Sequence, residues 1–143
     1  MPSDNFEQEW KTFCSLIFKE IELLKEQKEK NDVEIKKQET AIKIIEMSGN
    51  NADFLLKHKE FFTSFNDSEL NRKFTIIETF KERFNTLDNG VIPGICQEIL
   101  MSETVQGFLH QAKETITRLE AETTTITERI SKLTELRSAE QIG

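Results

Sequence analysis

The chain has 143 residues, with only 5 Gly and 2 Pro, and 26 acidic against 19 basic residues give it a formal net charge of −7. The scarcity of helix breakers and the 31% of charged residues favour long helices over disorder. The acidic excess is spread along the chain, which argues against a basic surface for nucleic acid and against binding to an anionic membrane.

The first predicted helix spans residues 4–47, where apolar residues recur at steps of three and four. Lys28, Asn31 and Gln38 interrupt this seam with polar side chains, which weaken coiled-coil packing but can fix its register. The helix should end at the breaker cluster Ser48–Asn51.

The second predicted helix spans residues 51–88 and carries apolar residues at the same steps. The segment Asn66–Ser68 either bends this helix or divides it in two, with Ser68 as the N-cap of the second piece. Asp88–Gly90 should end the helix, because Gly90 suits the left-handed turn that closes many helices.

The third predicted helix spans residues 93–139, with Pro93 in the first turn, where its missing N–H costs nothing. A break near Ser102 stays open, because Ser-Glu-Thr can restart a helix. Between Leu109 and Leu133 the apolar positions alternate at steps of three and four, which is the heptad pattern of a coiled coil.

Three helices of similar length with short connections predict an all-α fold, an elongated antiparallel bundle with coiled-coil-like packing. The whole chain, residues 1–143, would form a single domain. In this up-down-up order the first and third helices are parallel, and one pole of the bundle gathers most aromatic residues. The expected members of that pole are Phe6, Trp10, Phe13, Phe18, Phe74, Phe80, Phe84, Ile95, Ile99 and Phe108.

No catalytic or metal-binding motif stands out. His58 and His110 are the only histidines, and a metal site needs three or four ligands. Cys14 and Cys96 lie beside apolar residues and fit buried free thiols, with a disulfide left open. We therefore expect no enzyme activity, no metal and no cofactor.

Two segments are candidates for binding a partner. The adjacent rings of Phe61 and Phe62 either belong to the core or form an exposed docking groove. The end of the third helix offers more apolar surface than the polar part of the first helix can cover. Its candidate residues are Ile126, Ile130, Leu133 and Leu136.

These features predict a protein–protein interaction module, a coiled-coil scaffold or adaptor subunit whose partner is another protein's helix or a second copy. The alternative is a membrane-associated helical bundle that binds or remodels lipid, including a toxin-like stalk, although the acidity argues against it. The first ten residues are polar and acidic, unlike a secretory signal, and no apolar stretch approaches the ~20 residues of a membrane span. We therefore expect a soluble, cytoplasmic protein.

Overall fold

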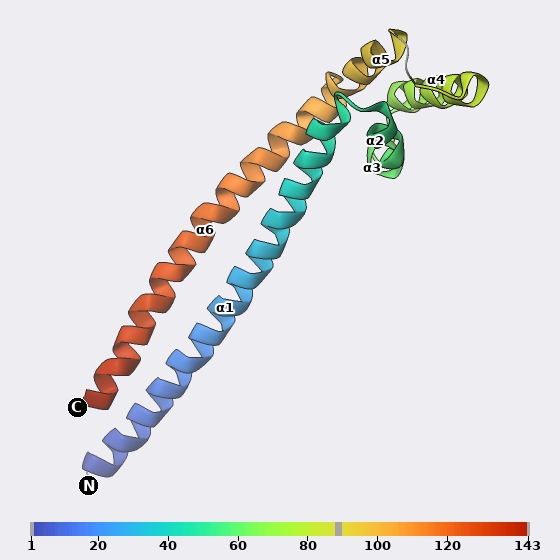
Figure 1. Ribbon diagram of the computed structural model, residues 1–143. Coiled ribbons are helices and arrows are strands. Elements are labelled where there is room, and N and C mark those ends of the chain that lie inside the picture. Colours follow the sequence, from blue (N-terminus) through green and yellow to red (C-terminus); the bar gives the residue numbers. More distant parts are fainter. Residues whose placement is uncertain (1, 88–89, 143) are drawn as a thin grey trace. The chain divides into compact units, whose positions relative to one another are not determined.

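A computed structural model of the chain describes residues 2–87 and 90–142. These residues are helical apart from short connections and contain no strand, so the all-α prediction is confirmed. In chain order (Figure 1) the helices are α1 (Pro2–Ser48), α2 (Ala52–Lys57), α3 (Lys59–Thr63), α4 (Ser68–Phe84), α5 (Val91–Leu100) and α6 (Glu103–Ile142).

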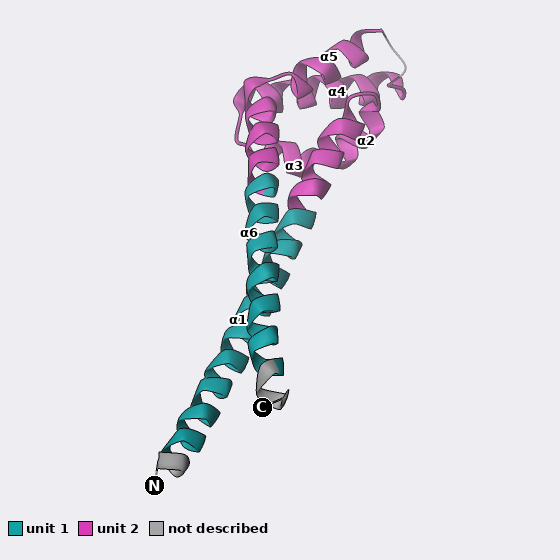
Figure 2. Ribbon diagram, turned by 90° about the vertical axis from the view of Figure 1, so that its left-hand side faces the viewer, with its two compact units in different colours: residues 1–36, 116–143 teal, residues 37–115 magenta. Residues whose placement is uncertain are grey.

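The chain divides into two compact units (Figure 2). Unit 1 comprises residues 1–36 and 116–143, which include the first part of α1 and the last part of α6. Unit 2 comprises residues 37–115, which include the end of α1, the four shorter helices and the start of α6.

In unit 1 the two helices pack side by side and run antiparallel (Figure 2). Glu20 contacts Arg129, and Asn31 contacts Thr123. Residue numbers along α6 therefore decrease in the direction in which those along α1 increase. The parallel arrangement expected for the first and third helices is therefore wrong. The seam between the two helices buries Ile17, Ile21, Asn31, Leu119 and Ile126.

A polar layer interrupts this seam at Asn31, whose side chain is 3% exposed. The Gln27 amide donates a hydrogen bond to Asn31 Oδ1 over 3.0 Å, and Asn31 Nδ2 donates to Thr123 Oγ1 over 3.5 Å. Because both ends of the buried amide are bonded only when Asn31 faces Thr123, the layer favours one register of the two helices.

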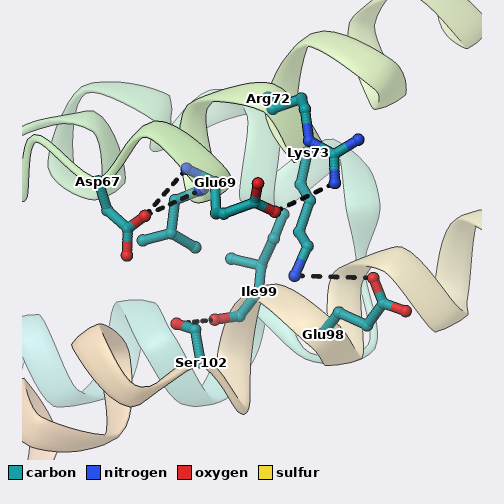
Figure 3. Close-up of polar contacts among 8 residues, drawn as sticks. Asp67, Glu69, Arg72, Lys73, Glu98, Ile99 and Ser102 are labelled. Carbon is teal, nitrogen blue, oxygen red and sulfur yellow. Dashed lines mark hydrogen bonds and ion pairs between the residues drawn. The ribbon is translucent and has the colours of Figure 1, made fainter.

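The expected second helix is broken into α2, α3 and α4, and the three-helix bundle is not found. The first break is at His58, and the second follows Thr63, where Asn66 adopts a left-handed φ of 56°. Asp67, rather than Ser68, is the N-cap of α4: its Oδ1 accepts hydrogen bonds from the N–H groups of Glu69 and Leu70 (Figure 3).

The end of α4 also differs from the prediction. The helix stops at Phe84, and the left-handed residue that closes it is Asn85, with a φ of 52°. Gly90 has a φ of −63° and precedes α5, so it does not close a helix. Asn tolerates the left-handed region because its short amide bonds locally, which explains why Gly was not needed. Residues 88 and 89 lie outside the described part of the chain.

The breaks let large side chains from several helices converge on one core in unit 2. Its buried members are Ile45, Leu55, Phe62, Leu70, Phe74, Ile77, Ile92, Cys96, Ile99 and Val105. Each fully buried Phe or Leu contributes roughly 1.5–3 kcal/mol of transfer free energy, so this core is the main source of stability in unit 2. The expected aromatic pole is wrong, since its α1 members belong to unit 1 and the remainder to unit 2.

Polar contacts fix the helices around the core of unit 2. The Thr104 hydroxyl donates to Asp67 Oδ2 over 2.6 Å, which links the start of α4 to α6. Lys73 pairs with Glu98 at 3.7 Å and links α4 to α5 (Figure 3). The end of α1 at Ser48 is confirmed, and Gly49 follows it. A Cβ at Gly49 would lie 2.9 Å from Leu100 Cδ2, so a larger residue there would require the Leu100 side chain to shift.

Candidate interaction surface

The histidines do not form a site. His58 is half-buried and its ring lies 4.4 Å from that of Phe54. His110 is exposed, and its Nε2 lies 3.0 Å from Glu114 Oε1 one helical turn away. Within the described residues, no group of three or more His, Cys, Asp or Glu side chains could hold a metal ion.

Cys96 is a buried free thiol, as expected, whereas Cys14 is only half-buried. Burial raises the pKa of the Cys96 thiol, so little of the reactive thiolate is present at neutral pH. Cys96 lines an open cavity of about 440 Å³ in unit 2, together with Asp53, Ile92 and Pro93. The Asp53 carboxylate already pairs with Lys81 at 3.3 Å. The cavity therefore presents no activated nucleophile beside a base.

The two aromatic candidates for partner binding lie in the core of unit 2. Phe62 is fully buried, so it occupies the core position that was the alternative to an exposed docking groove. Phe61 is half-buried and packs edge-on against Phe62, Phe65 and Phe108, with ring centroids 5.2–5.5 Å apart. Adjacent residues on a helix point about 100° apart, and here Phe62 contacts Phe74 of α4 while Phe61 contacts Phe108 of α6.

The four candidates on α6 form a gradient of exposure along unit 1. Ile126 is 9% exposed, Ile130 and Leu133 are half-buried, and Leu136 is 51% exposed. Ile126 is buried within unit 1 and therefore offers a partner little surface. Leu136 is the one of the four whose side chain is mostly open to solvent.

The matching part of α1 shows a similar gradient. Ile21 and Ile17 are 3% and 6% exposed, whereas Phe13, Trp10 and Phe6 are 43%, 36% and 64% exposed. Figure 2 shows the first turns of α1 diverging from α6, which explains why these rings are uncovered. The rings stack on one another instead, with centroids 6.2 Å apart for Phe6 and Trp10 and 5.4 Å apart for Trp10 and Phe13.

Two further apolar residues of α1 are exposed beside the seam. Leu16 is 60% exposed and Leu23 is 61% exposed, and they lie two turns apart on one side of the helix. Leu16 and Leu23 fall outside the three-and-four pattern of the seam, so the periodicity of the seam did not indicate them. A second apolar line beside the first could have indicated them, since helices that pack against two neighbours carry a wider apolar stripe.

The exposed apolar residues of α1 and α6 in unit 1 form the candidate interaction surface. Among the described residues, no helix combines the length and the apolar character needed to cross a membrane. Comparison of the chain with protein-family models, with curated proteins and with solved structures finds no match.

Proposed function

We propose that the chain is a non-enzymatic protein–protein interaction module, a coiled-coil scaffold or adaptor subunit of a larger assembly in the cytoplasm. The observation that supports this proposal is the uncovered apolar surface of α1 in unit 1, from Phe6 to Leu23. The core of unit 2 buries Phe62 and Phe74 completely, whereas these side chains of unit 1 remain in water.

The mechanism we propose is helix docking. An amphipathic helix that lies on this surface would cover the rings of Phe6, Trp10 and Phe13, and burying them would supply the binding free energy. Charged side chains such as Glu9, which lines the same shallow groove as these rings, would select the partner and its register.

A photoreactive residue tests this proposal. Benzoyl-phenylalanine at position 13 should cross-link to a small number of defined proteins in an extract of the native cells. The same residue at position 33 is the control, because Val33 is 64% exposed and lies away from the aromatic groove. The proposal fails if positions 13 and 33 give the same diffuse products.

Membrane association remains the second candidate function, and the stacked aromatic side chains favour it, since Trp and Phe enter lipid interfaces. The chain has one Trp and no Tyr, so its fluorescence reports on Trp10 alone. A blue shift of this emission with vesicles of phosphatidylcholine, and co-sedimentation with them, would support the membrane candidate. The interaction module predicts neither, and the net charge of −7 predicts still weaker binding when phosphatidylserine is added.

A further inference from the structure

The aromatic groove on the first turns of α1 contains a carboxylate as well as aromatic rings. It is lined by Phe6, Glu9, Trp10 and Phe13. Each residue of a helix advances by about 100°, so Glu9 lies roughly 60° around α1 from Phe6 and roughly 40° from Phe13. Glu7 lies about 60° from Trp10, on the opposite side of the row of rings. The rings therefore have a carboxylate on each flank.

These two carboxylates have no cation beside them in the chain itself. Glu7 and Glu9 are exposed, and within the part of the chain that the structure describes neither forms an ion pair. The lysines closest in sequence are Lys11 and Lys19, and both lie roughly 100° or more around α1 from each of the three rings. The groove therefore presents apolar rings between negative charges.

The position of Glu9 restricts what can cover the rings. Any molecule that covers them also removes water from Glu9, because this residue lines the same groove. A carboxylate that loses water without gaining a cation destabilises the complex. The occupant therefore needs a Lys or Arg against Glu9, beside the apolar groups that cover the rings. A second α1 would offer carboxylates at this place, and lipid acyl chains offer no charge.

The chain shows which chemistry covers α1 where a second helix is present. A few turns along α1, Ile17 and Ile21 are buried against α6. At the edge of this seam α6 supplies two arginines. Arg129 Nη2 lies 3.8 Å from Glu20 Oε1, and the Arg137 guanidinium lies 5.5 Å from the centre of the Phe18 ring. An apolar line with cations at its edge therefore covers the carboxylates and rings of α1 within unit 1.

We propose, on the basis of the interaction function above, that the aromatic groove binds a basic amphipathic helix of another protein. This helix would cover Phe6, Trp10 and Phe13 with apolar residues at steps of three and four. It would place Lys or Arg on both sides of that line, against Glu9 and Glu7. The same carboxylates would attract such a partner before contact and so raise the rate of association.

Two synthetic amphipathic peptides test the charge of the partner. Both carry the same line of Leu residues at steps of three and four, but one has Lys at the flanking positions and the other has Glu. Trp10 is the only Trp of the chain, so its emission reports on binding at the groove. The Lys peptide should shift this emission to the blue until saturation, and the Glu peptide should bind at least about tenfold more weakly. Equal affinities, or no binding of the Lys peptide, would overturn the proposal.

Charge variants separate the groove from the overall acidity of the chain. Glu9→Gln should raise the dissociation constant of the Lys peptide by about fivefold or more and make it less dependent on salt. The matched control is Glu26→Gln, which changes the net charge equally. Glu26 is exposed and lies roughly 160° around α1 from Phe6, so binding should stay within about twofold. Equal losses in the two variants, with unchanged helicity by circular dichroism, would overturn the groove as the site.

The photoreactive residue at position 13 distinguishes this proposal from the interaction function. Mass spectrometry of the cross-linked product identifies the captured segment, which should carry Lys or Arg beside apolar residues at helical spacing. A defined protein captured through an acidic segment, or a second copy of this chain, would overturn the basic partner and leave the interaction function standing. A blue shift with vesicles of phosphatidylcholine but none with the Lys peptide would overturn both.

Discussion

The two units of this chain cover their apolar side chains to different extents. Unit 2 draws residues from α1, α2, α3, α4, α5 and α6 around one core, and Phe62 and Phe74 are completely buried there. Unit 1 has two helices, and only one line of residues on each faces the other. Phe13 and Leu16 therefore remain exposed although they are as apolar as the core of unit 2.

The difference shows that burial depends on how many neighbours surround a helix, and not on its composition. A helix with one partner covers a narrow seam, whereas a helix among several covers most of its circumference. Four predictions test this contrast.

The largest expected effect comes from truncating the same residue type in the two units. Phe74→Ala should lower the free energy of unfolding by about 3–5 kcal/mol, because it leaves a cavity in a closed core. Phe6→Ala should change it by less than about 0.5 kcal/mol, because the ring is 64% exposed. Urea titrations followed by circular dichroism at micromolar protein concentration measure both.

Equal losses for the two variants would contradict the contrast, since they would mean that Phe6 is as well covered as Phe74. Hydrogen exchange measured by mass spectrometry assigns each loss to its unit. Phe74→Ala should accelerate exchange in α4 and α5 first, because those helices contribute most of the neighbouring core residues.

A smaller effect of opposite sign is expected at the polar layer of unit 1. Asn31→Leu should stabilise the pairing of α1 with α6 by about 1 kcal/mol, because it removes a buried amide from the seam. It should also allow other registers between α1 and α6, since the hydrogen bond from Asn31 to Thr123 that favours the native register is lost. Spin labels on the two helices should give a narrow distance distribution in the native chain and a broader one in the variant. Asn31→Gln is the control, because it retains the amide.

The next prediction concerns how the stability of unit 2 depends on pH. The hydrogen bond from Thr104 is the largest cause that lowers the pKa of Asp67, and the α4 N–H groups add to it. A carboxyl whose folded pKa lies below its unfolded value of about 3.9 stabilises the fold above that value. This stability is lost as the pH falls through the folded pKa.

Asp67→Asn should therefore lower the urea midpoint at pH 7, and the difference from the native chain should shrink below about pH 4. The measurement is a series of urea titrations from pH 7 to pH 3. Thr104→Val is the matched variant, since it removes the hydrogen bond that lowers the pKa and keeps the carboxyl. A difference that stays constant over this range would exclude Asp67 as the titrating group.

The smallest effect is expected at the surface ion pairs. Arg72→Ala should alter the free energy of unfolding by no more than about 0.5 kcal/mol, because Arg72 and Glu69 are both more than 60% exposed. High salt should reduce even this difference. A loss of several kcal/mol would mean that Arg72 supports the core in a way that its exposure does not indicate.

The sequence alone determined the helical content, the end of α1 at Ser48 and the place of Asn31 in the seam, because periodicity and breakers are local signals. It also indicated that Asn66–Ser68 interrupts the middle region, but it did not indicate how far the chain changes direction there. Two different backbones, a bend or a full reversal, satisfy the same turn residues.

Only the tertiary structure decided between them. The reversal is stable because it lets Phe62 and Phe74 meet Val105, residues far apart in the chain whose joint burial no local pattern records. Once the middle region folds on itself, α6 runs antiparallel to α1, where a single long helix in the middle would have made them parallel. The direction of α6 therefore depends on long-range burial in the core of unit 2.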